Sequence, residues 1–247
     1  MSENSSTPWF EQWFDSTYYH ILYSNRDEKE AERFIRRLCG SPFFPPTGKV
    51  LDLGCGKGRH AQTFHDLGYT TSGIDLSPNS IEWARRKRSP EINFEVGDMR
   101  DFQTASPQDV IANLFTSFGY FDNVAENLKV LECIRKNIRD EGIFILDFFN
   151  LHHVSANLVK REEKVVKDVL FHIRREISET HVLKNIQLDH DGEHIDVTER
   201  VQALKPEELH VLVREVGFEI EATFGSYHLE PFDMMFSPRI IIVAKKV

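Results

Sequence analysis

The sequence predicts an α/β fold with a doubly wound, mainly parallel seven-stranded sheet, an antiparallel β insertion after the fifth strand and an N-terminal helical cap. Three observations lead to this prediction. Short apolar runs alternate with helix-like stretches from about residue 49 to residue 150, which is the pattern of parallel strands joined by right-handed crossovers. A long segment of alternating, β-branched residues follows, and two further apolar runs close the chain. Ahead of residue 47, apolar residues recur at the helical period instead.

The N-terminal segment is expected to be helical. In residues 9–22, large apolar and aromatic side chains recur at roughly the helical period. A second helix is expected from about residue 27 to residue 38, because Gly40 and Pro42 end it. Residues 1–8 are polar and are expected to be disordered.

The main sheet is expected to take its strands from both sides of the insertion. Its seven strands are predicted at 50–53, 70–76, 92–96, 109–115, 142–149, 219–224 and 240–245. The helices between them are predicted at 59–67, 78–87, 123–137 and 206–216, the last with a proline in its first turn.

The insertion is predicted to be an antiparallel sheet with one buried face. Asp191-Gly192 is typical of a hairpin turn. Apolar residues alternate with polar ones on both sides of this turn, which implies burial over the active site or between subunits; they are Ile186, Leu188, Ile195 and Val197. The predicted domains are a helical cap at 1–46, a main domain at 47–150 and 204–247, and the insertion at 151–203.

Composition and charge exclude several classes of function. The net charge of −9 is opposite to the basic surface that nucleic-acid binding requires. No stretch approaches the roughly 18 apolar residues of a membrane span, and the polar N-terminus has no signal core. Three cysteines without paired spacing, and eleven histidines without ligand spacing, predict neither disulfides nor a metal site. The chain is expected to be cytoplasmic and to bind neither nucleic acid nor membrane.

The strongest chemical signal is Val50-Leu-Asp-Leu-Gly-Cys-Gly-Lys-Gly-Arg-His. A strand ends near Asp52, three glycines alternate, and a helix begins, at the edge where open α/β sheets bind ligands. A dinucleotide fingerprint would read G-x-G-x-x-G, whereas the third glycine here comes one residue early. Asp52 would also repel a pyrophosphate and suit an ammonium group. The loop therefore predicts a nucleotide-like ligand other than a dinucleotide.

Two further loops carry polar groups at the same edge of the sheet. Asp75 ends the second strand about 20 residues after the first glycine, where a carboxylate can accept both hydroxyls of a ribose. Leu76 follows it and can pack against an adenine face. After the third strand, Asp98 can accept from an exocyclic amine and the N–H of Met99 can donate to a ring nitrogen. Asp75 has a second interpretation as a helix cap, although Ser77 can cap that helix instead.

Together these motifs resemble the class I S-adenosylmethionine-dependent methyltransferases, which have a Rossmann-like fold. The resemblance is carried by Leu51-Asp-Leu-Gly-Cys-Gly-Lys-Gly, Gly73-Ile-Asp-Leu-Ser, Gly97-Asp-Met-Arg-Asp-Phe and Asn113-Leu-Phe-Thr-Ser-Phe-Gly-Tyr-Phe. Tyr18-Tyr-His-Ile-Leu-Tyr, followed by Arg26-Asp, is similar to the cap helices of the small-molecule members. The amino-sugar N-methyltransferases are the most similar type, and glycine N-methyltransferase is more distant.

The resemblance implies a cofactor, S-adenosylmethionine, and a product, S-adenosylhomocysteine. It implies that Asp52, Gly54 and Gly56 lie against the methionine part and that the backbone near Leu114 accepts from the methionine ammonium. It also implies ribose binding by Asp75, with Leu76 beside the adenine and Asp98 and Met99 at its edge. Tyr19 matches the family's tyrosine near the sulfonium, and Tyr23 lies one helical turn further on. The insertion resembles theirs, which roofs the substrate pocket and helps oligomers form, so a homodimer is implied.

The acceptor is expected to be a small molecule, with an amine favoured. An amine nucleophile needs mainly desolvation and alignment, whereas an oxygen nucleophile usually needs a general base. The candidates for a catalytic role are Tyr19, His152 and His153, and His20 and Tyr120 are further candidate bases. In the amino-sugar enzymes the residue after the matching tyrosine is commonly Asp, whereas here it is His20, so the resemblance does not fix the substrate class. A non-catalytic cofactor-binding module and a nicotinamide-dependent oxidoreductase are the alternatives.

Overall fold

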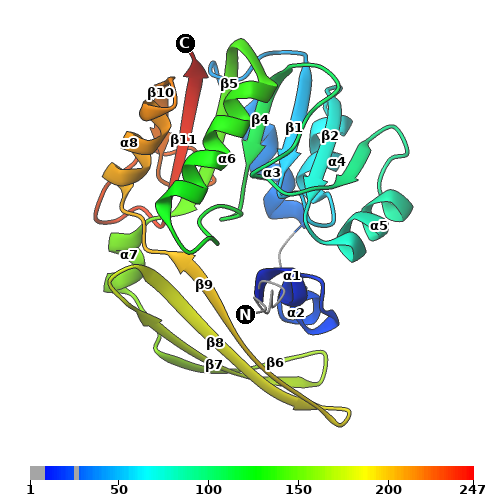
Figure 1. The fold of residues 1–247 in the computed structure, drawn as a ribbon, viewed down its shortest axis with the longest axis vertical. Coiled ribbons are helices and arrows are strands. Elements are labelled where there is room, and N and C mark those ends of the chain that lie inside the picture. Colours follow the sequence, from blue (N-terminus) through cyan, green and yellow to red (C-terminus); the bar gives the residue numbers. More distant parts are fainter. Residues whose placement is uncertain (1–8, 25–27) are drawn as a thin grey trace, which may run out of the picture.

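The computed structural model describes residues 9–24 and 28–247. The main sheet has seven strands in the order β10-β11-β5-β4-β1-β2-β3 (Figure 1). Neighbouring strands from β3 to β5 pair in parallel, whereas β11 pairs antiparallel with both β5 and β10. The strand bounds are Lys49–Leu53 (β1), Thr70–Asp75 (β2), Asn93–Val96 (β3), Gln108–Asn113 (β4), Ile138–Phe149 (β5), Phe218–Phe224 (β10) and Arg239–Lys246 (β11).

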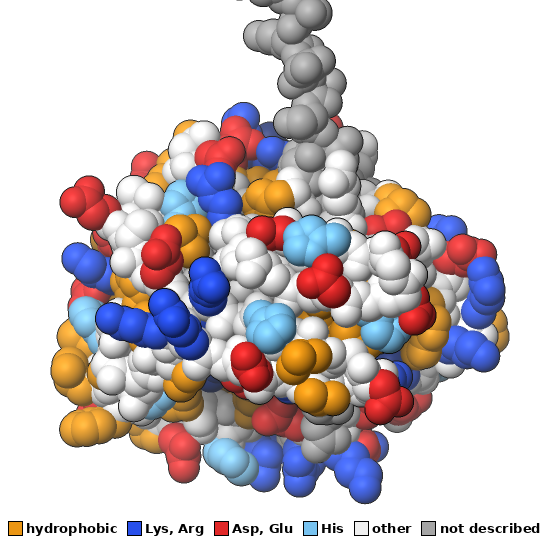
Figure 2. All heavy atoms as spheres, turned by 90° about the horizontal axis from the view of Figure 1, so that it is seen from below, with side chains coloured by type: hydrophobic (Ala, Val, Ile, Leu, Met, Phe, Trp, Pro, Cys, Tyr) orange, Lys and Arg blue, Asp and Glu red, His pale blue; other side chains and the backbone are white. Residues whose placement is uncertain are grey.

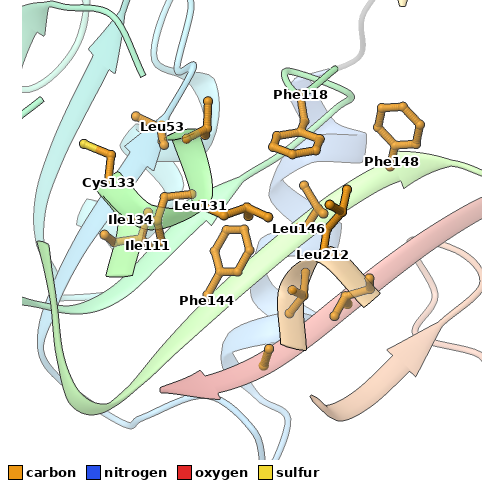
Figure 3. Packing of buried hydrophobic residues seen from close by; sticks show 14 of the residues in the cluster. Leu53, Ile111, Phe118, Leu131, Cys133, Ile134, Phe144, Leu146, Phe148 and Leu212 are labelled. Carbon is orange, nitrogen blue, oxygen red and sulfur yellow. The ribbon is translucent and has the colours of Figure 1, made fainter. Parts of the chain in front are cut away.

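Alternate side chains of the strands pack into two hydrophobic layers, one on each face of the sheet, as expected for a sheet covered on both faces. One layer joins Leu53, Ile111 and Phe144 to α6 and α8 (Figure 3). The other joins Val50 and Ile145 to α3 and α4. The helices are α3 (Glu28–Cys39), α4 (Arg59–Asp66), α5 (Pro78–Lys87), α6 (Val124–Asn137), α7 (Leu151–Ala156) and α8 (Pro206–Glu215). The predicted Rossmann-like, doubly wound architecture is confirmed.

The insertion forms a separate antiparallel sheet in the order β6-β7-β8-β9. Its strands are Arg161–Val166, Val169–Ile177, His181–His190 and Glu193–Gln202. Ile186 and Leu188 are buried on its inner face, and Ile195 and Val197 pack beside them. On the outward side, seen from below, acidic, basic and histidine side chains are interspersed (Figure 2). The alternation in the sequence therefore predicted the buried face correctly.

The cap lies between the two sheets (Figure 1). It comprises α1 (Trp9–Phe14) and α2 (Thr17–Leu22), and Trp13, Tyr18 and Leu22 pack onto the inner face of the insertion. The helical period continues through residues 9–22, but the structure breaks it into two helices, because the Ser16 hydroxyl accepts from the Tyr19 N–H at 3.0 Å and caps α2. The sequence allowed the apolar face of the insertion to be buried over the active site or between subunits. In the structure, the cap of the same chain covers this face.

Two predictions at the segment ends differ from the structure or fall outside it. The fifth strand begins at Ile138 rather than at residue 142, since α6 runs directly into it. Residues 1–8, expected to be disordered, and Arg26-Asp27 lie outside the described residues. The domain boundaries at 46, 150 and 203 stay predictions. No helix within the described part of the chain is both long and apolar enough to cross a membrane.

Candidate functional site

A cavity of about 600 Å³ opens at the carboxyl ends of β1, β2, β3 and β4. Its volume is within the range of small-molecule and cofactor sites. Strand order reverses between β1 and β4, and open α/β sheets bind ligands at such a switch point. The cavity is lined by the glycine loop, by the loops after the next three strands and by the cap.

The glycine loop forms one wall and depends on residues without side chains. Gly54 has a φ of 78°, and a Cβ there would come within 2.6 Å of the Ser117 side chain. Gly58 caps α4 in the left-handed conformation, and a Cβ there would meet the Phe94 ring at 2.5 Å. At Gly56, no atom of the described residues lies within 4 Å of the corresponding position. The loop therefore presents backbone to the cavity at Gly54 and Gly56, as close approach of a ligand requires.

Asp52 is placed differently from the sequence-based expectation, since it does not line the cavity. Its side chain is 1% exposed, and its Oδ2 accepts from the Ala61 N–H at 3.1 Å. Burial raises the pKa of this carboxyl to about 7, although the Ala61 hydrogen bond and the nearby Arg59 charge oppose the shift. Asp52 therefore joins the end of β1 to the first turn of α4 from beneath the loop.

Asp75 does line the cavity, at the end of β2. Its two oxygens accept from the Gly56 N–H at 2.7 Å and from the Ser77 N–H at 2.9 Å. Burial raises the pKa of this carboxyl, and these backbone hydrogen bonds oppose the shift. Ser77, rather than Asp75, caps α5, because its hydroxyl accepts from the Ser80 N–H. Each Asp75 oxygen keeps a lone pair for a ligand hydroxyl.

The loop after β3 brings Asp98 and Met99 to the cavity, and Leu76 lines it from the loop after β2. Arg100 donates to both Asp98 oxygens, with the Nη2–Oδ2 contact at 2.6 Å, and also pairs with Glu126. Burial opposes ionisation of Asp98, but the Arg100 hydrogen bonds outweigh it and hold the pKa below its usual range. The structure thus fixes an ionised acceptor at this end of the cavity.

The cap closes the opposite wall with aromatic rings. Tyr19 and Tyr23 both line the cavity, with ring centroids 4.8 Å apart. Phe14 packs against Tyr19 at 5.1 Å. Tyr18 points away, into the insertion, where its hydroxyl donates to the His190 carbonyl oxygen. The two consecutive tyrosines therefore face different environments, as their helical spacing predicts.

His152 and His153 do not line the cavity. They lie in α7, which Asn150 caps and ties to the loop before β11 through hydrogen bonds to the Met234 and Ser237 carbonyl oxygens. The His152 Nε2 atom instead lies 4.0 Å from a carboxylate oxygen of Glu207 in α8. This geometry gives no support to either histidine as a general base.

Several lining residues were not assigned a site role from the sequence. Among them are Lys57, Arg59, His60, Trp83, Phe115 and Lys167. The sequence did signal Arg59 and His60, because they directly follow the glycine loop. Trp83 and Lys167 carried no such signal, since their approach to the cavity depends on how α5 and the β6–β7 turn pack. Leu114, His20 and Tyr120 line the cavity as well.

Comparisons with known proteins agree with this geometry. A family model described as a methyltransferase domain matches residues 46–217. The chain is 28% identical over 136 residues to dTDP-3-amino-3,4,6-trideoxy-alpha-D-glucopyranose N,N-dimethyltransferase from Streptomyces venezuelae, covering 53% of this chain and 57% of that protein. The chain spans about half the length of the curated relatives it matches.

Solved structures share the whole fold. An S-adenosylmethionine-dependent methyltransferase from Clostridium acetobutylicum superposes with a TM-score of 0.78 at 19% identity, covering 93% of this chain and 96% of that one. CalS10, an S-adenosylmethionine-bound amino pentose methyltransferase from Micromonospora echinaspora, superposes with a TM-score of 0.70 at 20% identity. The match covers 94% of this chain and 98% of that one. The chain belongs to the methyltransferase domain family and has the Rossmann-like fold of these S-adenosylmethionine-dependent methyltransferases.

Proposed function

We propose that this chain transfers a methyl group from S-adenosylmethionine to the amine of a small molecule, of the amino-sugar class. The observation that carries this proposal is the composition of the cavity. Asp75 and Asp98 lie at one end, where their carboxylates can accept hydrogen bonds from a ribose and from an adenine. The paired rings of Tyr19 and Tyr23 close the cavity from the cap. The names of the curated relative and of the amino pentose methyltransferase support the acceptor class.

The cofactor contacts follow from the order of the strands. Asp75 holds the ribose hydroxyls, and Leu76 packs beside the adenine. Asp98 and the Met99 N–H hold the adenine edge. Gly54, Gly56 and the backbone at Leu114 surround the methionyl part. These assignments are supported by the position of each residue on the cavity wall. Asp52 supports the loop from below and is left out of the contact set.

The residues of the cap prepare the site for methyl transfer. When bound, S-adenosylmethionine supplies the methyl group as a sulfonium with a good leaving group. Tyr19 and Tyr23 exclude water from this end of the cavity. Alignment of the acceptor then supplies much of the rate for an amine. Neither His152 nor His153 is part of this proposal.

The environment of His20 suits an amine as the methyl acceptor better than an acidic group. It lines the cavity from α2, and its Nε2 atom is buried without a hydrogen-bond partner among the described residues. Burial lowers the pKa of His20 to about 4, and the nearby Lys57 charge adds to the shift. The imidazole is therefore neutral at neutral pH and can accept from an amine N–H.

Location and assembly remain proposals as well. We keep the cytoplasm as the expected compartment, supported by the three free cysteines. We keep the homodimer as a prediction, supported by the resemblance of the insertion alone, because its apolar face packs against the cap of the same chain. Light scattering on the purified chain measures the assembly directly.

A product screen tests the proposed reaction. The purified chain is incubated with S-adenosylmethionine and panels of amino sugars, both free and nucleotide-linked, simple amines and phenols, and the products are read by mass spectrometry. We expect one or two added methyl groups on an amino sugar, and less product with the Asp75→Ala variant at a limiting concentration of the cofactor. Methylation of phenols alone would contradict the amine assignment, and no methylated product from any panel would contradict the enzymatic role.

A further inference from the structure

The turn after β4 holds an uncommon backbone conformation. Phe115 and Thr116 have φ values of 56° and 63°, in the left-handed region. Such a conformation costs a residue with a Cβ on the order of 1 kcal/mol or more, so the surroundings must impose it. The Phe115 N–H donates to the Asp147 Oδ2 at 2.8 Å, and the Thr116 N–H donates to the Asp147 carbonyl oxygen at 3.1 Å. Asp147 therefore holds both strained residues.

Asp147 is itself fixed by a buried ion pair. It is fully buried at the end of β5, and Arg239 of β11 donates to its Oδ1 from Nε and Nη2, both at 2.8 Å. The Tyr227 hydroxyl donates to Oδ2 at 3.1 Å. Arg239 also donates to the Thr116 hydroxyl at 2.9 Å. A buried carboxylate with this many donors has one stable position.

The turn presents the Phe115 ring as a platform. The Tyr227 ring stacks on Phe115, with centroids 4.9 Å apart and planes within 16°. The Arg59 guanidinium lies 3.8 Å from the centre of the same Phe115 ring. Arg59 is the first residue of α4, directly after the glycine loop, and it lines the cavity with Phe115. The stack therefore directs a planar cation to the cavity wall.

We propose that Arg59 binds the carboxylate of the cofactor's methionyl group, and that Asp147, Arg239 and Tyr227 are positioning residues that act on Arg59 through the turn at Phe115 and Thr116. The proposal rests on the proposed function for the cofactor's orientation. In the sheet, β4 and β3 lie on opposite sides of β1 and β2. A nucleoside held at β2 and β3 therefore brings its methionyl end to β1 and β4, where Arg59 lies.

The chemistry of the guanidinium suits this ligand. Its planar donors match a carboxylate in two hydrogen bonds, and stacking on an aromatic ring fixes their direction before binding. The N-terminus of α4 adds a favourable dipole, because Gly58 caps the helix without a side-chain acceptor. Lysine cannot reproduce the stacked geometry.

Two ligands separate the carboxylate from the rest of the cofactor. S-adenosylhomocysteine carries the amino-acid group, whereas 5′-methylthioadenosine lacks it and keeps the nucleoside and the sulfur. Calorimetry measures both affinities for the wild type, Arg59→Met and Arg59→Lys. We expect Arg59→Met to lower the affinity for S-adenosylhomocysteine about 10- to 100-fold. The affinity for 5′-methylthioadenosine should change less than about threefold. Arg59→Lys should lower the affinity for S-adenosylhomocysteine by an intermediate amount. Arg36→Met, at an exposed ion pair on α3, is the matched control and should change neither.

The positioning residues are tested by the same ratio of affinities. Asp147→Asn and Tyr227→Leu should weaken S-adenosylhomocysteine more than 5′-methylthioadenosine, whereas a purely structural role would lower the melting temperature and leave the ratio unchanged. If Asp147→Asn does not fold, Tyr227→Leu decides. Equal changes for both ligands in Arg59→Met, or none, would overturn the carboxylate assignment. A wild type that binds neither ligand would instead overturn the cofactor proposal.

Discussion

At the scale of single residues, burial separates the roles of two carboxylates that the sequence placed in one site. Asp75 reaches the cavity, where its oxygens are held by two backbone N–H groups. Asp52 is only two residues from the glycine loop, yet it points beneath the loop and accepts from Ala61. Spacing in the sequence cannot distinguish these cases, because both follow the same pattern of a strand ending in an acid. The direction of each side chain in the folded strand distinguishes them: Asp75 points to the cavity, and Asp52 points to α4.

Replacing Asp75 with alanine should weaken S-adenosylhomocysteine binding by roughly 1.5–3 kcal/mol, the scale of hydrogen bonds to a charged group. Calorimetry at neutral pH measures the change. Asp66→Ala is the control, since Asp66 is exposed on α4. Unchanged affinity in the Asp75 variant would remove this carboxylate from the ribose site.

Replacing Tyr19 with phenylalanine should keep the fold and lower turnover, because its ring packing with Phe14 and Tyr23 is retained while the hydroxyl is lost from the cavity. Steady-state kinetics with the acceptor found in the product screen measures this. Tyr18→Phe is the matched control, since its hydroxyl faces the insertion. Wild-type turnover in Tyr19→Phe would leave Tyr19 with a packing role alone.

Asp52 should make stability depend on pH. Its folded-state pKa of about 7 lies above the ordinary value of about 3.9. The folded protein therefore binds more protons than the unfolded chain between about pH 4 and pH 7, and the free energy of unfolding falls as the pH rises through this window. Asp52→Asn removes this contribution and keeps an oxygen for the Ala61 N–H.

Urea denaturation at pH 5 and pH 8 measures this effect. Relative to the wild type, Asp52→Asn should gain at least about 1 kcal/mol of unfolding free energy between pH 5 and pH 8. Asp66→Asn, at an exposed position of α4, should show no such gain. A parallel pH dependence in the wild type and Asp52→Asn would contradict the raised pKa.

At the scale of elements, periodicity predicted the strands and helices well and their packing partners less well. The seven strands of the main sheet, the hairpin at Asp191-Gly192 and the helix at Pro206 all follow local signals. The break between α1 and α2 was missed, because the apolar period continues across it and the Ser16 cap is a single residue. The strained turn at Phe115 and Thr116 gave no local signal either, since it is imposed by Asp147 and Arg239 from distant strands.

The cap is joined to the insertion by a polar cluster that sequence spacing could not reveal. Glu199 of β9 accepts from the Trp13 indole N–H and the Tyr23 hydroxyl, both at 2.7 Å. Lys184 of β8 lies 3.5 Å from Glu199 and donates to the Tyr23 hydroxyl. Because Tyr23 also lines the cavity, the insertion holds the cap in the position that closes the site.

Replacing Glu199 with alanine should therefore loosen α1 and α2 and weaken S-adenosylhomocysteine binding by several-fold, since the hydrogen bonds of Trp13 and Tyr23 to a charged group are lost. Hydrogen exchange of residues 17–22 should rise in this variant. Asp196→Ala removes an exposed carboxylate of the same strand that bonds Asn185 and Gln187 of β8, and it is the control. Unchanged exchange and affinity in Glu199→Ala would show that apolar packing alone holds the cap.

At the scale of the whole molecule, the cap lies between the two sheets (Figure 1). The cavity is lined by loops of the main sheet, by the cap and by Lys167 of the β6–β7 turn. The main sheet supplies the edge where a nucleoside can bind, and the cap supplies rings that exclude water. The insertion stabilises the cap through the apolar face that the sequence predicted to be buried. Acidic and basic side chains are interspersed on its outer surface (Figure 2).

Direct binding measurements show whether this chain takes up S-adenosylmethionine. Calorimetry compares S-adenosylmethionine, S-adenosylhomocysteine and NAD at the same protein concentration. We expect saturable binding of both sulfur compounds, together with a rise in melting temperature that grows with ligand concentration, and no measurable heat from NAD. Binding of NAD in preference to S-adenosylhomocysteine, or no binding of either sulfur compound, would contradict this expectation.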